Sequence, residues 1–226
     1  MSLIGSLKQR GQIWSGDDWR LGNLQATSTG LAKLDHHLPG KGWPLGAVTE
    51  IFYTQLGQGE VRLVMPFLNK LKQEDQRWQV WLNPPQSLNG PSLTHWGMEP
   101  SNTLICFAEK ESDQLWTLEQ SITSGGSSTV LAWVNKLEKS QLRRIQLAAE
   151  KNRMSVFLFR PEKMIASPSV AALRILVNQV DSEQVSIDIK KRKNGWPVEG
   201  IKVPLSLQFQ KKVIRSSILN FKVKSS

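Results

Sequence analysis

The 226-residue chain contains a single cysteine and three histidines, and this scarcity excludes several kinds of site. One cysteine cannot form a disulfide within the chain or a multi-cysteine metal centre. We expect Cys106, which sits in an apolar run, to be a buried thiol in a reducing compartment. His36 and His37 are adjacent and point in different directions, while His95 has no partner at metal-ligand spacing. We therefore expect no metal, no cofactor and no histidine-based catalysis.

Long apolar runs and internal repeats are also missing. No stretch approaches the roughly 18 apolar residues that a membrane span requires. The first ten residues lack the unbroken apolar segment of a signal peptide. The length suits one main domain with extensions, since roughly 100–200 residues per domain is usual. We expect a cytoplasmic protein with no membrane partner.

The net charge of +10 is concentrated at one end of the sequence. The segment from Lys190 to Ser226 contains ten Lys and Arg and a single acid, Glu199, whereas the preceding 189 residues hold 19 basic and 18 acidic residues. Clustered positive charge favours a polyanionic partner such as nucleic acid, an acidic protein or a membrane surface. A solvated end that only aids solubility is the alternative.

Two kinds of contact are candidates for the basic end. Single-stranded DNA could be tracked by its cations, with Trp196 stacked on a base or, alternatively, closing the end of a hairpin. A protein partner could instead bind the apolar residues of the tail. The candidates for DNA binding are Lys190, Lys191, Arg192, Lys193, Trp196, Lys202, Lys211 and Lys212, and those for partner binding in the tail are Ile218, Leu219 and Phe221.

Short apolar runs alternate with amphipathic stretches, which predicts an α/β fold with a mostly parallel sheet flanked by helices. The expected helices place Val61, Val64, Leu68 and Leu71 on one stripe, then Leu115, Leu118 and Ile122 after an N-cap at Ser112, then Leu142, Ile145 and Ala149 after Ser140. The expected strands are Ala47–Phe52, Trp78–Leu82, Thr103–Phe107, Ser128–Val134 and Met154–Arg160.

Beyond Pro161 the pattern changes to strict alternation. Two alternating runs flank a Gly195-Trp-Pro turn and predict an antiparallel C-terminal β-hairpin. Pro204 places the second strand at a sheet edge. The predicted organisation is an N-terminal extension (1–27), a core domain (28–180), the hairpin (181–210) and a basic tail (211–226).

The segment after the first strand resembles the phosphate loop of RecA-like ATPases, but without its chemistry. Such a loop needs a Lys for the phosphates and a Ser or Thr for magnesium. If Gly59 corresponds to the glycine before that Lys, Glu60 and Val61 take the two positions. Pro85 and Trp133 stand where the resemblance places a glutamate and an aspartate. The P-loop is therefore degenerate, and Gly57 with Gly59 predicts a tight turn.

A wider resemblance rests on the order and spacing of several segments. They are Thr29–Gly30, Leu34–Asp35, Leu38–Pro44, Trp81–Pro85, Leu131–Trp133, Arg144–Glu150, Phe157–Pro161 and Ser167–Arg174. With these residues the chain resembles the ImuA family of RecA-like proteins. The resemblance implies a non-catalytic adaptor of the SOS response in error-prone translesion DNA synthesis, with ImuB, a DnaE-type polymerase and RecA as partners.

The segment from Gly46 to Pro161 is also similar to SulA, the SOS inhibitor of cell division that binds FtsZ. This is the alternative reading, and the Gly40–Trp43 segment and the basic hairpin favour ImuA over it. In either reading, Trp14, Trp19 and Arg20 of the N-terminal extension are candidate anchors for a partner, since tryptophans often dominate interfaces. Packing of these tryptophans on the protein's own core is the alternative.

Overall fold

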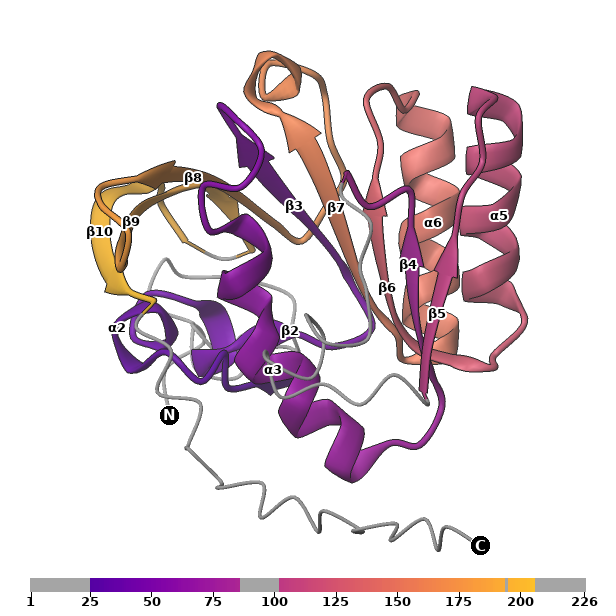
Figure 1. The fold of residues 1–226 in the computed structure, drawn as a ribbon, viewed down its shortest axis with the longest axis horizontal. Helices are drawn as coiled ribbons and strands as arrows, with labels where there is room; N and C mark the ends of the chain where they lie inside the picture. Colours follow the sequence, from indigo (N-terminus) through magenta and orange to yellow (C-terminus); the bar gives the residue numbers. More distant parts are fainter. Residues whose placement is uncertain (1–24, 86–101, 194, 206–226) are drawn as a thin grey trace, which may run out of the picture.

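A computed structural model describes residues 25–85, 102–193 and 195–205. Its centre is an eight-stranded sheet with the strand order β10-β9-β8-β3-β7-β6-β4-β5 (Figure 1). The strands are β3 (Val48–Tyr53), β4 (Trp78–Leu82), β5 (Thr103–Cys106), β6 (Ser127–Trp133), β7 (Ser155–Pro161), β8 (Leu173–Gln179), β9 (Gln184–Arg192) and β10 (Val198–Pro204). The six strands from β8 to β5 are parallel, and β9 and β10 add an antiparallel edge. The predicted mixed α/β fold with a mostly parallel sheet is confirmed.

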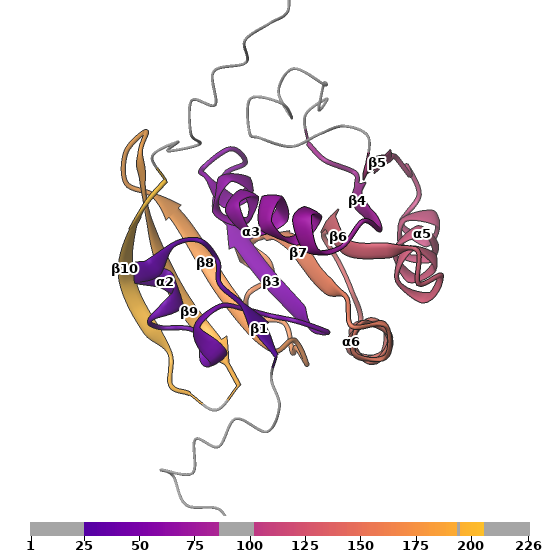
Figure 2. The same ribbon diagram turned by 90° about the horizontal axis from the view of Figure 1, so that it is seen from below.

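Helices cover both faces of the parallel strands. Helix α3 (Glu60–Glu74) lies on one face, and α5 (Glu111–Thr123) and α6 (Lys139–Asn152) lie on the other (Figure 2). Alternate residues of β3, β4, β5, β6 and β7 therefore enter two separate apolar clusters, one under α3 and one under α5 and α6, whereas β8 contributes to the first cluster alone. Burial on both faces explains why these strands read as short apolar runs in the sequence.

The predicted parallel strands agree with the observed ones to within a residue at each end. The predicted helix starts are less accurate. Ser112 is not an N-cap, because α5 already begins at Glu111 after Lys110. Ser140 is not one either, since Glu138 caps α6 in a reciprocal arrangement with Gln141. The hydrogen bonds between Glu138 and Gln141 start α6 at Lys139, so Ser140 is already inside the helix.

The antiparallel hairpin of β9 and β10 is confirmed, and Pro204 does lie on an edge strand. Strand β8, however, was not among the predicted elements. It pairs in parallel with β3 and antiparallel with β9, and it joins the hairpin to the main sheet. The hairpin is thus a continuation of the central sheet.

An N-terminal layer packs beside α3. It consists of β1 (Ala26–Thr27), α2 (Ala32–Asp35), a 3-10 turn η1 (Pro39–Lys41) and β2 (Trp43–Pro44), which pairs with β1. Asp35 organises the entry to α2 by accepting hydrogen bonds from Ser28 Oγ at 2.6 Å and from the Thr29 N–H at 2.8 Å. Trp43 is fully buried and meets Phe157 edge to face. The layer is therefore part of the core under α3.

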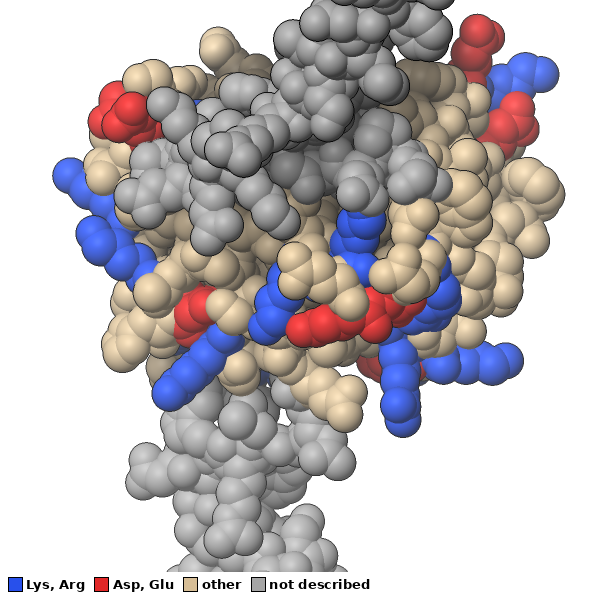
Figure 3. Space-filling model, turned by 60° about the horizontal axis from the view of Figure 1, so that its bottom comes forward, with Lys and Arg blue, Asp and Glu red and all other residues tan. Residues whose placement is uncertain are grey.

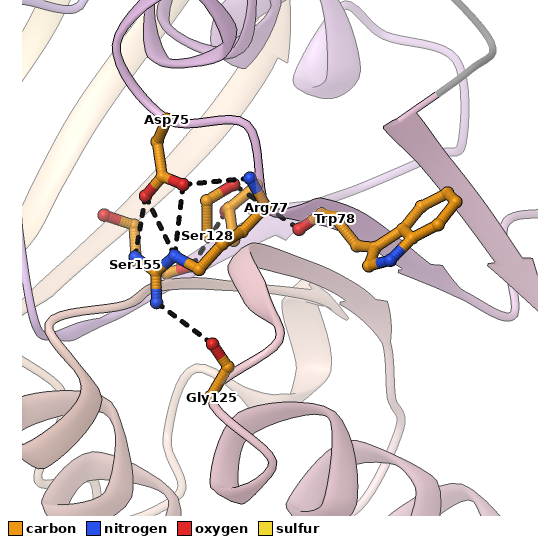
Figure 4. Close-up of polar contacts among 7 residues, drawn as sticks. Asp75, Arg77, Trp78, Gly125, Ser128 and Ser155 are labelled. Atoms are coloured by element: carbon orange, nitrogen blue, oxygen red, sulfur yellow. Dashed lines mark hydrogen bonds and ion pairs between the residues drawn. The ribbon is translucent and has the colours of Figure 1, made fainter.

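Polar contacts close the edge of the sheet where the parallel strands begin. Arg77 donates two hydrogen bonds from Nε and one from Nη2 to the Asp75 carboxylate, and it reaches the Gly125 carbonyl at 3.4 Å (Figure 4). The side-chain hydrogen bonds from Arg77 lower the pKa of Asp75, although burial opposes this shift. Ser128 Oγ donates to the Trp78 carbonyl in the same region (Figure 4). The start of β4 is thereby tied to the start of β6.

Candidate functional site

Strand β3 lies where the strand order of the sheet reverses. It pairs with β7 on one side and β8 on the other, and the chain leaves β3 through α3 to reach β4 beyond β7. From β7 the chain crosses to β8 on the opposite side of β3. Open α/β sheets bind ligands outside the carboxyl ends of strands at such a point. The loop from Thr54 to Gly59 occupies this position.

The side chain of Glu60 is hydrogen-bonded to the backbone of this loop. Glu60 is 1% exposed, and its Oε1 accepts the Gly57 N–H at 2.9 Å. A phosphate-binding loop would direct such an N–H at the ligand. Burial and the Glu60 carboxylate also raise the pKa of Tyr53, at the end of β3. A negatively charged ligand would therefore meet a buried carboxylate here, and Val61 packs against the apolar core.

The end of the hairpin covers the same loop. Gly59 has φ +99°, and a Cβ on it would lie 2.7 Å from Leu205 Cδ1 and 2.9 Å from Val185 Cγ1. Arg62 of α3 donates to the carbonyls of Leu205 and Ser182. The predicted tight turn at Gly57 and Gly59 is therefore present, and Gly59 also allows close packing against β9 and the residue after β10.

Aromatic rings stack across three neighbouring strands. Trp133, at the end of β6, lies 4.4 Å from Phe159 of β7 with an interplanar angle of 12°, and 5.8 Å from Trp81 of β4 with an angle of 25°. Trp133 is only 8% exposed. Pro85 follows β4 and is exposed. The two positions that hold acidic residues in a RecA-like ATPase are thus occupied by Trp133, in a buried aromatic stack, and by the exposed Pro85.

The core of this arrangement has known relatives. Residues 46–155 match the family model of the cell division inhibitor SulA. This matched segment is just under half of the chain and runs from the start of β3 to the first residue of β7.

Individual SulA proteins show the same similarity. The cell division inhibitor SulA of Serratia proteamaculans is 27% identical over 120 residues, which are 53% of this chain and 71% of that protein. SulA of Yersinia enterocolitica is 26% identical over 132 residues, and SulA of Yersinia pseudotuberculosis is 27% identical over 133. Each Yersinia alignment covers 58% of this chain and 78% of the relative.

A buried ion cluster links the matched segment to the strands beyond it. Glu50 of β3 is 0% exposed and binds Arg160 of β7 through one carboxylate oxygen and Arg174 of β8 through the other, the latter at 2.7 Å. The Arg174 guanidinium also lies 4.9 Å from the ring centroid of Phe52. Sequence reasoning missed this cluster, since its members are 110 and 124 residues apart. The sequence did contain one sign of the cluster, since Glu50, Arg160 and Arg174 are each a charged residue within an otherwise apolar segment.

The four basic residues from Lys190 to Lys193 do not share one surface. Lys190 bridges Asp188 and Glu199, and the hydrogen bond that it donates to Glu199 raises its pKa. Lys191 donates to the Ser169 carbonyl on the face that carries Arg174, and burial lowers its pKa. Arg192 turns to the opposite side and donates to the His37 carbonyl after α2. Only the fourth, Lys193, is exposed without a side-chain partner among the described residues.

The other predicted contact residues divide into two groups. Trp196 and Lys202 are exposed, on the turn after β9 and on β10 respectively. The described residues exclude Trp14, Trp19, Arg20, Lys211, Lys212, Ile218, Leu219 and Phe221. On the lower face of the described protein, basic and acidic side chains are interspersed (Figure 3). That view therefore shows no continuous basic track.

Two further features bear on function. A cavity of about 440 Å³ opens between the ends of β5 and β6 and the starts of α5 and α6, with Glu109, Glu111 and Glu138 among its lining residues. Cys106, expected to be buried, is only partly so, and burial raises its pKa. Within the described ranges we find no cluster of potential metal ligands, and no helix there is long and apolar enough to cross a membrane.

Proposed function

We propose that this chain is a non-catalytic, cytoplasmic protein of the SulA type, which inhibits bacterial cell division by binding FtsZ. The match of residues 46–155 to the cell division inhibitor SulA carries this proposal. It covers four of the eight strands of the main sheet, β3, β4, β5 and β6, together with α3, α5 and α6. The function lies in a binding surface on this part of the protein.

The geometry of the loop after β3 supports a binding role over ATP hydrolysis. Glu60 occupies the phosphate position as an internal acceptor, and Leu205 packs against the same loop. An ATPase also needs acidic groups that hold magnesium and prepare water. Trp133 and Pro85 supply neither. We expect no magnesium-dependent phosphate release from ATP above that of a matched blank.

Exposed aromatic residues on the matched segment are the first candidates for the FtsZ contact. Phe107, after β5, is 69% exposed, and Trp116 of α5 is 64% exposed. Large exposed aromatic side chains commonly anchor protein interfaces. Trp196 is 83% exposed but lies outside the matched segment, so it serves as a matched control.

The test is the effect of the purified full chain on FtsZ polymerisation and GTPase activity, together with cell length after overproduction in a rod-shaped bacterium. We expect inhibition and elongated cells. The Phe107→Ala/Trp116→Ala variant should lose most of the inhibition, and Trp196→Ala should keep it. Unchanged FtsZ activity at excess wild-type protein would refute the proposal.

A second candidate, the ImuA-type adaptor in translesion synthesis, is favoured by one observation. Much of the resemblance to ImuA lies outside residues 46–155, and those residues are built into the fold. Trp43 is fully buried, Asp35 organises the entry to α2, and Arg174 binds the buried Glu50. Co-purification with an ImuB-type protein, a DnaE-type polymerase or RecA, together with no effect on FtsZ, would favour this candidate.

A further inference from the structure

An exposed tryptophan, Trp196, lies between β9 and β10, and its carbonyl is hydrogen-bonded to the end of β9. Trp196 is the most exposed large hydrophobic residue of the described chain. Arg192 Nε donates to the Trp196 carbonyl at 2.9 Å, and its guanidinium also donates to the His37 carbonyl. Gly195 leaves room for the arginine side chain, which a Cβ there would meet. The exposed indole of Trp196 is therefore attached to a backbone position that Arg192 holds, and the exposed Lys193 is three residues away in the sequence.

The cavity at the other end of the fold has complementary chemistry. The lining is mostly polar: three glutamates share it with a single lysine, Lys136, while Leu115, Val134 and Leu137 provide the smaller apolar part. Its volume of about 440 Å³ offers room for a large side chain. An indole buries about 150–250 Å² and donates one hydrogen bond, which a glutamate accepts. The surplus negative charge suits an adjacent ammonium group.

The turn and the cavity lie at opposite corners of the sheet. Arg192, at the turn, pairs with Leu173 at the start of β8, on the amino edge of the parallel strands. The cavity lies beyond the carboxyl ends of β5 and β6, on the opposite edge. The strand order also puts β9 and β10 at one side of the sheet and β5 at the other (Figure 1). A chain cannot insert this Trp196 into its own cavity.

We propose that Trp196 of one copy enters the cavity of a second copy, with Lys193 against Glu109 and Glu111. The contact joins two different surfaces, so each dimer retains one free turn and one free cavity. Such head-to-tail contacts continue into open filaments or closed rings. Part of the attraction is between exposed charges, so association weakens as salt rises.

Sedimentation velocity of the full chain over a range of concentrations tests the contact. We expect species larger than a monomer that grow with concentration and dissociate in high salt. Trp196→Ala should raise the apparent dissociation constant at least about tenfold, as loss of an interface anchor does. Trp116→Ala, which removes another exposed tryptophan, should leave it unchanged. A wild-type chain that stays monomeric, or equal effects of the two variants, overturns the proposal.

A mixing experiment tests the head-to-tail geometry. Glu109→Lys/Glu111→Lys should associate as weakly as Trp196→Ala, because its cavity repels Lys193, and circular dichroism should show that both defective chains are folded. The two chains mixed together should form a dimer that grows no further, since one supplies an intact turn and the other an intact cavity. No dimer in the mixture overturns the geometry. The readout does not involve FtsZ, so failure here and failure of the proposed function are distinguishable.

Discussion

Replacing Arg160 with methionine removes one of the two guanidinium groups that bind Glu50 while keeping a side chain of similar length. The exposed fractions of the Arg160 and Glu50 side chains are 1% and 0%, so water cannot replace the lost partner. Breaking a buried ion pair costs about 3–5 kcal/mol. Arg174 still binds the second oxygen of Glu50, which points to the lower end of that range. We expect a loss of about 3 kcal/mol, or roughly 6–12 °C in melting temperature for a chain of this length.

Urea unfolding followed by circular dichroism measures this loss, and an exposed ion pair provides the control. Arg144 and Glu119 join α6 to α5 with side-chain exposures of 63% and 29%, so Arg144→Met should cost at most about 1 kcal/mol. Adding Glu50→Gln to Arg160→Met removes the carboxylate that still pairs with Arg174, whose side chain is 11% exposed, so the double variant should be less stable than Arg160→Met alone. Equal losses from Arg160→Met and Arg144→Met would refute the argument that the cluster is buried and paired.

Three further changes probe the loop after β3 and the amino edge of the sheet. Gly59→Ala should lower the free energy of unfolding by at least about 2 kcal/mol, since it combines a left-handed backbone with a steric clash, whereas Gly57→Ala has open space and should cost about 1 kcal/mol; thermal melts that rank them the other way would contradict this. Asp75→Asn should lower the melting temperature at neutral pH, and the difference from wild type should shrink in acid. The reason is that the depressed pKa of Asp75 stabilises the fold above the ordinary carboxyl pKa, and this stabilisation is lost as pH falls through the depressed value. Glu60→Lys/Val61→Thr should release no phosphate from ATP, because Pro85 and Trp133 still stand where an ATPase has its acidic groups. Phosphate release by this variant would show that those two positions do not prevent ATP hydrolysis.

The sequence predicted the parallel strands well because each is buried on both faces and bounded by turn residues. The predictions were wrong where two nearby residues could each start a helix, and they missed a strand whose charged residue pairs with one far away in the sequence. Ser112 and Ser140 are good N-cap residues, but the helices had already begun. Strand β8 has Arg174 among its apolar residues, and the carboxylate that pairs with this arginine, Glu50, is 124 residues away in the sequence.

The candidate site was predictable in part. The expected turn at Gly57 and Gly59 and the absence of a phosphate-binding lysine follow from residue identity alone. The cover by Leu205 depends on where the end of the hairpin meets the loop after β3, far away in the sequence, which no local pattern specifies. Counting cations overstated the basic surface, because Lys190, Lys191 and Arg192 each bind within the protein.

The Glu50 cluster also constrains how this protein can have diverged from shorter relatives. Glu50 lies inside the matched segment, whereas Arg160 and Arg174 both lie beyond its last residue. A chain cut at residue 155 would strand a carboxylate inside the sheet and expose the side of β3 that β8 covers. We therefore expect a related chain without the C-terminal strands to carry an uncharged residue at the position of Glu50. In this protein those strands complete the sheet, and removing them would leave a buried charge without its partners.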